Sequence, residues 1–523
     1  MPKRIKSYIA LASLVLAAVF ITIFARRHGP VRRIPNAPLR PPVPEREKLI
    51  RYHPSDFTKA IPHVPIPQHP YMAPNPGSNM HCDAYISDTY EASGPLGLKP
   101  EVISRTQGFG GYGTITFDSK RRIVAVFSNG RKFKIELMDP YTFEELASYD
   151  LPPRHWSFFF KGIRPWEYLG AGMYFYLDHL DRAVVPTTRN TIQVVQAPDL
   201  VTSKKFELVR EYDVAEYMVP GKDDSPAFAL PDWDGKYYWF ASVEGVVGTI
   251  DVDSGVVRTM RLQGELVENS FAVGEDGVFI ISDQAMYRFS HDDNGNPVAD
   301  WRTEYSKAAE RKAGHISVGS GTSTTLAGTP KDGLIIIADN AEPRINLLFI
   351  KRSDGAVVCG IPLFAEGKSG TDLTVIGFEH ADENGKGTGV YSAIAENNWG
   401  PHTFPFVRAE PGLTRVDAVR NGDGTYTCKE VWTTREKSIG GFRLSLGNGL
   451  VYIYDQILSL CNSKWYFTAI DFKTGETVYR KLTGTGMGYN NWQGSLFLHP
   501  DGGIAVSTTI FGVVMIRDTV QQL

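Results

Sequence analysis

The chain has 523 residues, 42% of them hydrophobic, which is enough to bury a large core without a disulfide framework or a structural metal. Its 55 basic and 58 acidic residues nearly cancel and are scattered along the body, which excludes the basic surface of a nucleic-acid-binding protein. The four cysteines lie far apart without a C-x-x-C pair, which excludes the usual zinc and redox dithiol motifs and leaves both disulfides and buried free thiols open.

The first predicted element is a membrane-spanning helix. An uninterrupted apolar run covers residues 9–25, and basic residues stand on both sides of it. A run of this length reaches the lower limit for crossing the hydrocarbon core as a helix, and no small-residue cleavage site ends it. We therefore expect residues 1–28 to be an uncleaved signal anchor, with the rest of the chain outside the cytoplasm, in the periplasm or the extracellular space. The flanking basic residues are Lys3, Arg4, Lys6, Arg26 and Arg27.

Residues 29–80 are predicted to be a linker. This stretch is rich in proline, which disfavours long helices and central strands. Much of it is expected to be an extended spacer between the bilayer and the body, partly packed along that body. The remaining residues, 81–523, are expected to form the folded domain.

Most of the body consists of short strand-like runs in repeated units. Residues 225–262 contain four such runs, PAFALP, KYYWFAS, GVVGTIDV and VVRTMRL, separated by Asp-Gly, Glu-Gly and Ser-Gly turn pairs. Six similar units begin near Gly111, Gly172, Asn269, His315, Thr374 and Ile439, and the unit near His315 is expected to start with the run SVGS. Complete units that recur at this spacing predict an all-β fold, a β-propeller.

The last unit, 490–518, supplies only three runs, so its fourth strand must come from elsewhere. The segment from Lys99 to Ser104 is the expected donor, because pairing the two ends of the chain would close the ring and remove its open edges. An eight-bladed β-propeller is the result, with a seven-bladed ring as the alternative. Stacked β-sandwiches would also give many short strands, but they do not require a regular repeat.

One segment carries a family resemblance. Residues 469–479, AIDFKTGETVY, resemble the docking motif A-x-D-x-x-x-G-x-x-x-W of the quinoprotein alcohol-dehydrogenase-like superfamily of eight-bladed propellers, with Tyr479 in place of Trp. Asp471 and Gly475 would shape the turn between the third and fourth strands, and the aromatic residue would pack on the neighbouring blade. Weaker echoes occur at 250–255 and 351–355.

The resemblance has limits for function. The superfamily includes quinone-dependent dehydrogenases and non-enzymatic envelope proteins, so calcium and pyrroloquinoline quinone are the cofactors that it makes possible. The chain lacks the adjacent cysteine pair that is common beside the quinone, and the family's calcium ligands and catalytic aspartate find no match.

A first candidate site includes His81 and Asp83. They stand two apart just after the proline-rich stretch, a spacing that on a strand puts both side chains on one face. A metal site or an acid/base pair is one interpretation, and a polar plug segment that satisfies backbone groups is the other.

Two Asn-Asn-Trp triplets give a second set of candidates. Asparagine carbonyls can hold calcium or hydroxyl groups, and tryptophan faces can stack on a ring. The alternative is that Asn forms turns and Trp packs between blades. The ligand-binding candidates of this set are Asn397, Asn398, His402, Asn490 and Asn491.

Two further groups could lie at a channel mouth. One contains His155 and His179 with Arg154, Asp178 and Asp181, and the other contains Ser320, Thr322, Ser323 and Thr324. The chain has no G-x-S-x-G elbow, H-E-x-x-H helix or P-loop, which disfavours the reactions that use them.

These observations predict a membrane-anchored propeller outside the cytoplasm that binds a small molecule or a polypeptide partner at its channel mouth. The alternatives are a quinoprotein-like oxidoreductase and a calcium-dependent hydrolase or lactonase.

Overall fold

The computed structural model describes residues 59–107, 110–155, 172–315, 317–400, 409–457 and 463–519, and the backbone of 32–34, 402–403 and 406–407. The expected membrane helix over 9–25 and most of the linker lie outside these residues. Within the described part of the chain, no helix is both long and apolar enough to cross a bilayer.

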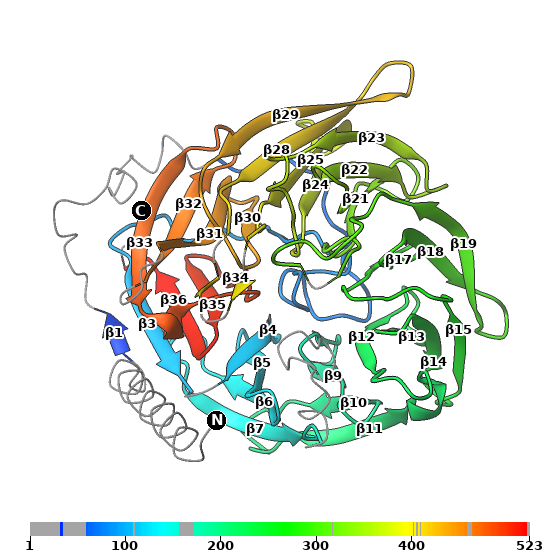
Figure 1. The fold of residues 1–523 in the computed structure, drawn as a ribbon. Coiled ribbons are helices and arrows are strands. Elements are labelled where there is room, and N and C mark those ends of the chain that lie inside the picture. Colours follow the sequence, from blue (N-terminus) through cyan, green and yellow to red (C-terminus); the bar gives the residue numbers. More distant parts are fainter. Residues whose placement is uncertain are drawn as a thin grey trace, which may run out of the picture.

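Eight four-stranded antiparallel sheets stand side by side around a central axis (Figure 1), and we number them blades 1 to 8 in chain order. Blade 1 holds β4 (Gly111–Phe117), β5 (Ile123–Ser128), β6 (Phe133–Met138) and β7 (Glu145–Leu151). Blade 2 holds β8 (Tyr176–Leu177), β9 (Arg182–Pro186), β10 (Thr191–Gln196) and β11 (Glu207–Asp213). Blade 3 holds β12 (Pro226–Pro231), β13 (Tyr237–Ser242), β14 (Val246–Asp251) and β15 (Val257–Arg261). Blade 4 holds β16 (Ala272–Gly274), β17 (Gly277–Ile281), β18 (Ala285–His291) and β19 (Pro297–Glu304).

The second half of the ring has the same plan. Blade 5 holds β20 (Thr325–Ala327), β21 (Leu334–Ala338), β22 (Asn346–Lys351) and β23 (Val357–Pro362). Blade 6 holds β24 (Ile376–Ala381), β25 (Gly387–Glu396), β28 (Leu413–Arg420) and β29 (Tyr426–Thr434), with the hairpin β26 (His402–Thr403) and β27 (Phe406–Val407) inserted. Blade 7 holds β30 (Arg443–Ser445), β31 (Leu450–Ile457), β32 (Lys464–Asp471) and β33 (Thr477–Thr485), with β2 (Thr89–Tyr90) parallel to β30. Two 3-10 turns are η4 (Ala215–Tyr217) and η5 (Met487–Tyr489).

Blade 8 closes the ring. It holds β34 (Leu496–Leu498), β35 (Ile504–Thr509) and β36 (Gly512–Arg517), and its fourth strand is β3 (Glu101–Thr106), to which β1 (Arg32–Ile34) adds outside. Val102 pairs with Ile516, and Arg517 forms an ion pair with Glu101 at 2.8 Å. The predicted eight-bladed ring and its closing strand are thus confirmed. The predicted start of blade 5 was wrong. The blade begins with β20 at Thr325, and the SVGS run is a loop.

Aromatic side chains on outer strands join neighbouring blades. Trp432 of β29 lies against Gly475, and its Nε1–H donates to the carbonyl of Phe472 at 2.8 Å. A Cβ atom on Gly475 would lie 2.7 Å from the Trp432 ring, and this residue has φ +75°, so the position favours glycine. The motif's own aromatic residue, Tyr479, lies against Gly97 and donates its hydroxyl hydrogen to the carbonyl of Pro95, so it packs on the segment before β3, whereas the prediction placed it on a neighbouring blade. A further pair that joins blades is Trp301 of β19 with Gly355.

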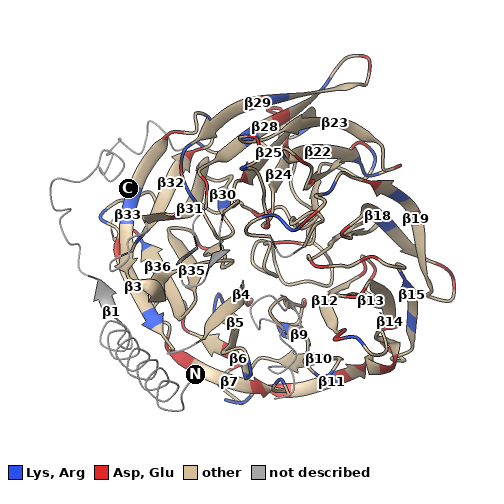
Figure 2. Ribbon diagram, in the orientation of Figure 1, with Lys and Arg blue, Asp and Glu red and all other residues tan. Residues whose placement is uncertain are grey.

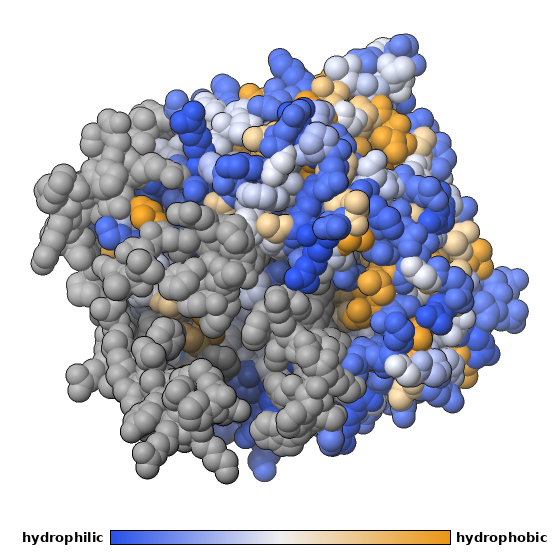
Figure 3. All heavy atoms as spheres, in the orientation of Figure 1, coloured by the Kyte–Doolittle hydropathy of each residue, from blue (hydrophilic) through white to orange (hydrophobic). Residues whose placement is uncertain are grey.

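The core lies in the inner and middle strands of the blades. Every residue of β12 and β13 is buried, whereas the outer strand β19 exposes about every second side chain, because it has a neighbour on one side only. Basic and acidic residues are interspersed around the ring, mainly on outer strands and turns (Figure 2). On the face seen in Figure 3 the described surface is mostly hydrophilic, with small separate hydrophobic patches.

One segment passes through the middle of the ring. Residues 59–98, which we call the threading segment, first cross the ends of the blades and then turn around the axis, where the segment appears as the blue loop in Figure 1. Its backbone carbonyls accept hydrogen bonds from the inner strands of six blades at 2.7 to 3.2 Å, which fixes it tightly. The described part of the expected linker, 59–80, therefore lies against the blades. The accepting carbonyls are those of Gly77, Ser78, Ala84, Tyr85, Ser87, Asp88 and Tyr90.

Candidate functional site

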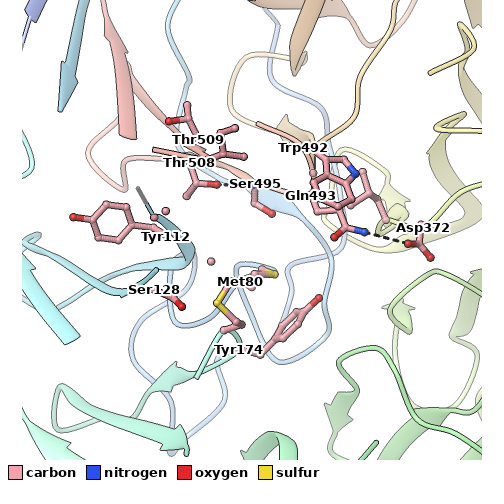
Figure 4. A pocket seen from close by; sticks show the side chains of 18 of the residues that line it. Met80, Tyr112, Ser128, Tyr174, Asp372, Trp492, Gln493, Ser495, Thr508 and Thr509 are labelled. Carbon is pink, nitrogen blue, oxygen red and sulfur yellow. Dashed lines mark hydrogen bonds between the residues drawn. The ribbon is translucent and has the colours of Figure 1, made fainter. Parts of the chain in front are cut away.

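A cavity of about 410 Å³ opens at one end of the channel. Its wall is formed by the segments that lead into the inner strands, by the β5–β6 turn and by the β35–β36 turn, while Met80 and His81 of the threading segment lie beneath it. Figure 4 shows Met80 and Tyr174 across the cavity from Ser495 and Thr508. The threading segment thus turns an open channel into a cup with a floor.

The wall combines aromatic surfaces with few charged groups. Tyr112, Phe133, Tyr174, Trp492 and Phe511 supply rings, and three of the described charged or imidazole side chains reach the cavity: Arg154, Asp372 and His81. Burial raises the pKa of both Tyr112 and Tyr174, so their hydroxyl groups stay neutral and act as hydrogen-bonding groups. Such a wall suits a compact ring-bearing ligand with a few polar atoms.

His81 is held in a buried polar cluster. Its Nδ1 lies 3.2 Å from the Asp88 carboxylate, and its Nε2 lies 3.2 Å from the Ser323 hydroxyl oxygen. Asp88 forms an ion pair with Arg443 of β30 at 2.8 Å, and neither of these side chains is exposed. His81 is 5% exposed and lines the cavity, as does Ser323. Among the predicted ligand-binding residues whose side chains the structure describes, only His81 lies on the cavity wall.

Asp83 belongs to the interior of the threading segment. Its carboxylate accepts hydrogen bonds from the backbone N–H of Tyr85 and from the Ser87 hydroxyl. Burial raises the pKa of Asp83 to about 7, although these hydrogen bonds act in the opposite direction. Asp83 shapes the turn and does not line the cavity.

The two Asn-Asn-Trp triplets meet at Asp372. Asn398 accepts a hydrogen bond from the backbone N–H of Asp372 at 3.0 Å, and Gln493, which follows the second triplet, donates to its carboxylate at 3.3 Å (Figure 4). Asn397 and Asn490 accept hydrogen bonds from the backbone two residues further on. These asparagines therefore support the loops that form the wall. Asn491 is fully buried behind the same loop, and the side chain of His402 lies outside the described residues.

The members of the two remaining candidate groups lie in different parts of the molecule. Ser323 and Arg154 line the cavity. Asp178 pairs with Arg182 in the β8–β9 turn and forms a bridge with Met72, so this turn lies at the other end of the channel, beside the threading segment. His179 and Asp181 belong to the same turn, and His155 is exposed.

The described wall does not fit a calcium-bound quinone. Calcium takes about six to eight oxygen ligands, usually including several carboxylates. Asp372 is the one carboxylate among the described residues of the wall. A cluster of Asp232, Asp234 and His291 is the one group of three or more metal-ligating side chains within the described ranges, and it lies in the turns of blades 3 and 4, away from the cavity.

Sequence reasoning missed Asp88 and Arg443. They are 355 positions apart and carry no motif, and their pairing depends on the path of the threading segment. Trp492 was visible as part of a triplet. The cavity rings Tyr112 and Tyr174 had no signal beyond their position just before or within an inner strand.

Comparisons with known proteins give distant matches. No family model matches the chain. A stretch of 291 residues, half of the chain, is 22% identical to an uncharacterized protein of Archaeoglobus fulgidus. The chain spans 55% of the length of that curated relative. Similar solved structures include the dihydro-heme d1 dehydrogenase NirN in complex with DHE, at 12% identity and a TM-score of 0.43, which covers 89% of this chain and 75% of NirN. Another is Saccharomyces cerevisiae Sqt1, at 11% identity and a TM-score of 0.37, over 65% and 94% of the two chains.

Proposed function

We propose that this eight-bladed propeller binds a small organic molecule in the cup-shaped cavity at its channel mouth. The observation that carries the proposal is the cavity of about 410 Å³ with aromatic walls and a floor made by the threading segment. Pockets that hold small ligands have volumes of roughly 300 to 1,000 Å³ and few polar groups. The ligand is expected to carry a ring or a short apolar chain.

The closed floor favours a small molecule over a polypeptide. An extended peptide needs an open groove or a free sheet edge, whereas this cavity is a compact pocket whose lining includes Met80 and His81 of the threading segment. The closing pair of β3 and β36 also removes the sheet edge at the seam of the ring.

An aromatic fluorescent probe tests the proposal. Anilinonaphthalene sulfonate should bind to the full-length protein with an increase in fluorescence that saturates at one probe per chain. Ser128, on the cavity wall, is replaced in Ser128→Trp so that the indole fills the cup. This variant should lose at least about tenfold in probe affinity, which corresponds to about 1.4 kcal/mol.

The control is Ser148→Trp, which adds the same side chain at an exposed position on the outer strand β7. Its probe affinity should equal that of the wild type. Equal binding by the wild type and Ser128→Trp would contradict a site in the cavity.

We further propose that residues 9–25 anchor the protein in a membrane and that the propeller lies outside the cytoplasm. The apolar run and its basic flanks support the anchor. A disulfide between Cys359 of β23 and Cys428 of β29 joins the outer strands of blades 5 and 6, and such bonds persist in oxidising compartments.

The protein should stay in the membrane pellet after an alkaline carbonate wash. In denatured, unreduced protein, Cys359 and Cys428 should resist maleimide, whereas Cys82, which is a free thiol, should react. Release by the wash contradicts the anchor, and reaction of Cys359 contradicts the compartment.

A further inference from the structure

The cluster at the cavity floor has the connectivity of a serine nucleophile with its base. Ser323 Oγ lies 3.2 Å from His81 Nε2, and His81 Nδ1 lies 3.2 Å from Asp88. Nucleophile and base lie within about 2.6 to 3.2 Å in catalytic triads and are often further apart before substrate binds. Ser323 and His81 line the cavity, while Asp88 lies behind them.

The residues around this cluster indicate the directions of its hydrogen bonds. Asp88 forms an ion pair with the Arg443 guanidinium at 2.8 Å, and its carboxylate accepts a hydrogen bond from His81 Nδ1. With its hydrogen on Nδ1, the imidazole turns the Nε2 lone pair towards Ser323. Ser270 donates its hydroxyl hydrogen to Ser323 Oγ at 3.0 Å, which leaves the Ser323 hydrogen free to point at Nε2. The hydrogen-bond directions therefore run from Ser270 through Ser323 to His81.

We infer that the protein hydrolyses small carboxylic esters, with Ser323 as nucleophile, His81 as general base and Asp88 as the residue that orients His81. This inference rests on the proposed function, since the ester would occupy the same cavity. The chemical class follows from the wall, because aromatic rings and the thioether of Met80 suit an aryl or short-chain acyl ester.

The reaction needs only the ester and water. Ser323 Oγ would bond to the carbonyl carbon while its proton passes to His81 Nε2. The ester C–O bond then breaks, and the leaving alcohol takes that proton. Water attacks the resulting acyl-serine, with His81 taking one of its protons. The carboxylic acid leaves, and Ser323 recovers its hydrogen.

The loop before β20 also offers donors for the oxyanion. The proposed donors are the backbone N–H groups of Ser323 and Thr324, which directly precede β20. Backbone N–H groups next to a nucleophile are the usual stabilisers of the tetrahedral intermediate. The tight approach of Gly321 to Thr371 and Asp372 fixes the course of this loop, since a Cβ on Gly321 would lie 2.4 Å from the Thr371 carbonyl oxygen.

Covalent labelling of the full-length wild-type protein is the direct test. A fluorophosphonate probe should modify Ser323, and mass spectrometry of the peptides should identify that residue without any variant being made. The protein should also hydrolyse 4-nitrophenyl butyrate. Ser323→Ala should lose the label and at least about 10³-fold in kcat/KM.

Ser392→Ala is the matched control. Ser392 is equally buried and also contacts a histidine and an aspartate, but it lies inside blade 6, away from the cavity wall. Its label and kcat/KM should stay within about twofold of the wild type.

The outcomes separate the two proposals. Absence of label on Ser323 in folded protein that still binds anilinonaphthalene sulfonate overturns the esterase and leaves the binding function standing. Failure of both the label and the probe overturns both. A Ser323→Ala protein that keeps its kcat/KM also overturns the esterase, because the hydrolysis then arises elsewhere.

Discussion

Two clusters in this propeller, one buried and one half-buried, contain the same three residue types in a different order. At the cavity, His81 stands between Asp88 and Ser323. In blade 6, Ser392 stands between His380 and Asp417, with its hydroxyl 2.7 Å from His380 Nε2 and 2.6 Å from Asp417. The order decides the chemistry. A histidine in the middle can take a proton from serine, whereas a serine in the middle donates its hydroxyl hydrogen bond to the carboxylate and not to the imidazole.

The surroundings of the two clusters differ as well. The blade 6 cluster is packed between strands and is held by Arg415, which donates to both Asp417 and Ser392. Burial lowers the pKa of His380 to about 4, so this imidazole is neutral at physiological pH and serves as a hydrogen-bond donor. Residue types alone therefore do not identify a reactive serine. Access to a cavity and the direction of the hydrogen bonds do.

Replacing each histidine gives the largest expected contrast. His81→Ala should lower kcat/KM for 4-nitrophenyl butyrate by at least about 10³-fold, because removal of the base disables a serine triad. His380→Ala should change it by less than about twofold. Steady-state kinetics on both variants, with melting temperatures to confirm folding, make the comparison. Equal losses in the two variants would show that they act through stability alone.

Removing the carboxylate of each cluster tests how much its ion pair with arginine contributes to the free energy of unfolding. Asp88→Asn leaves the Arg443 charge buried without its partner and should reduce the free energy of unfolding by about 3 to 5 kcal/mol. Asp417→Asn should cost about 1 kcal/mol, because Asp417 is 17% exposed and water can solvate its Arg415 partner. Urea unfolding midpoints measure both. An Asp88→Asn protein as stable as Asp417→Asn would mean that the Arg443 charge finds another partner.

The smallest expected effect concerns acid. The folded pKa of His380 lies near 4, below the ordinary value of 6.5, so the unfolded chain binds an additional proton between these values. Stability from this residue is present above pH 6.5 and is lost as the pH falls towards 4. His380→Gln, which stays neutral, should lose a few degrees less in melting temperature between pH 7 and pH 4.5 than the wild type. Parallel melting curves over this range would contradict the lowered pKa.

The repeated blades were predictable because their signals are local. Turn pairs such as Asp234-Gly235 and Ser254-Gly255 mark the ends of strands in each unit, and Gly235 and Gly255 adopt positive φ. The closing strand at Val102 followed from the three runs of the last unit, which left one place in the ring unfilled. These inferences need only neighbours in sequence and the rule that sheet edges are covered.

The candidate site was predictable only in part. His81 and Ser323 were recognised separately, but the expected partner of His81 was Asp83, from the alternation of a strand. The chain instead has positive φ at Cys82, Ile86 and Asp88, so it turns repeatedly and brings Asp88 back to His81. His81, Asp88 and Ser323 meet because of the path of the threading segment. Backbone carbonyls fix that path, and any residue type can supply a backbone carbonyl. Such long-range geometry lies beyond any local pattern.

The pairing of β3 with β36 also constrains when the ring can close during synthesis. The strand that follows the threading segment completes its sheet only with residues 512–517, which lie far along the chain from it. The ring can therefore close only after residues 512–517 have left the ribosomal exit tunnel. Until then β3 would have a free edge on the side that β36 later covers.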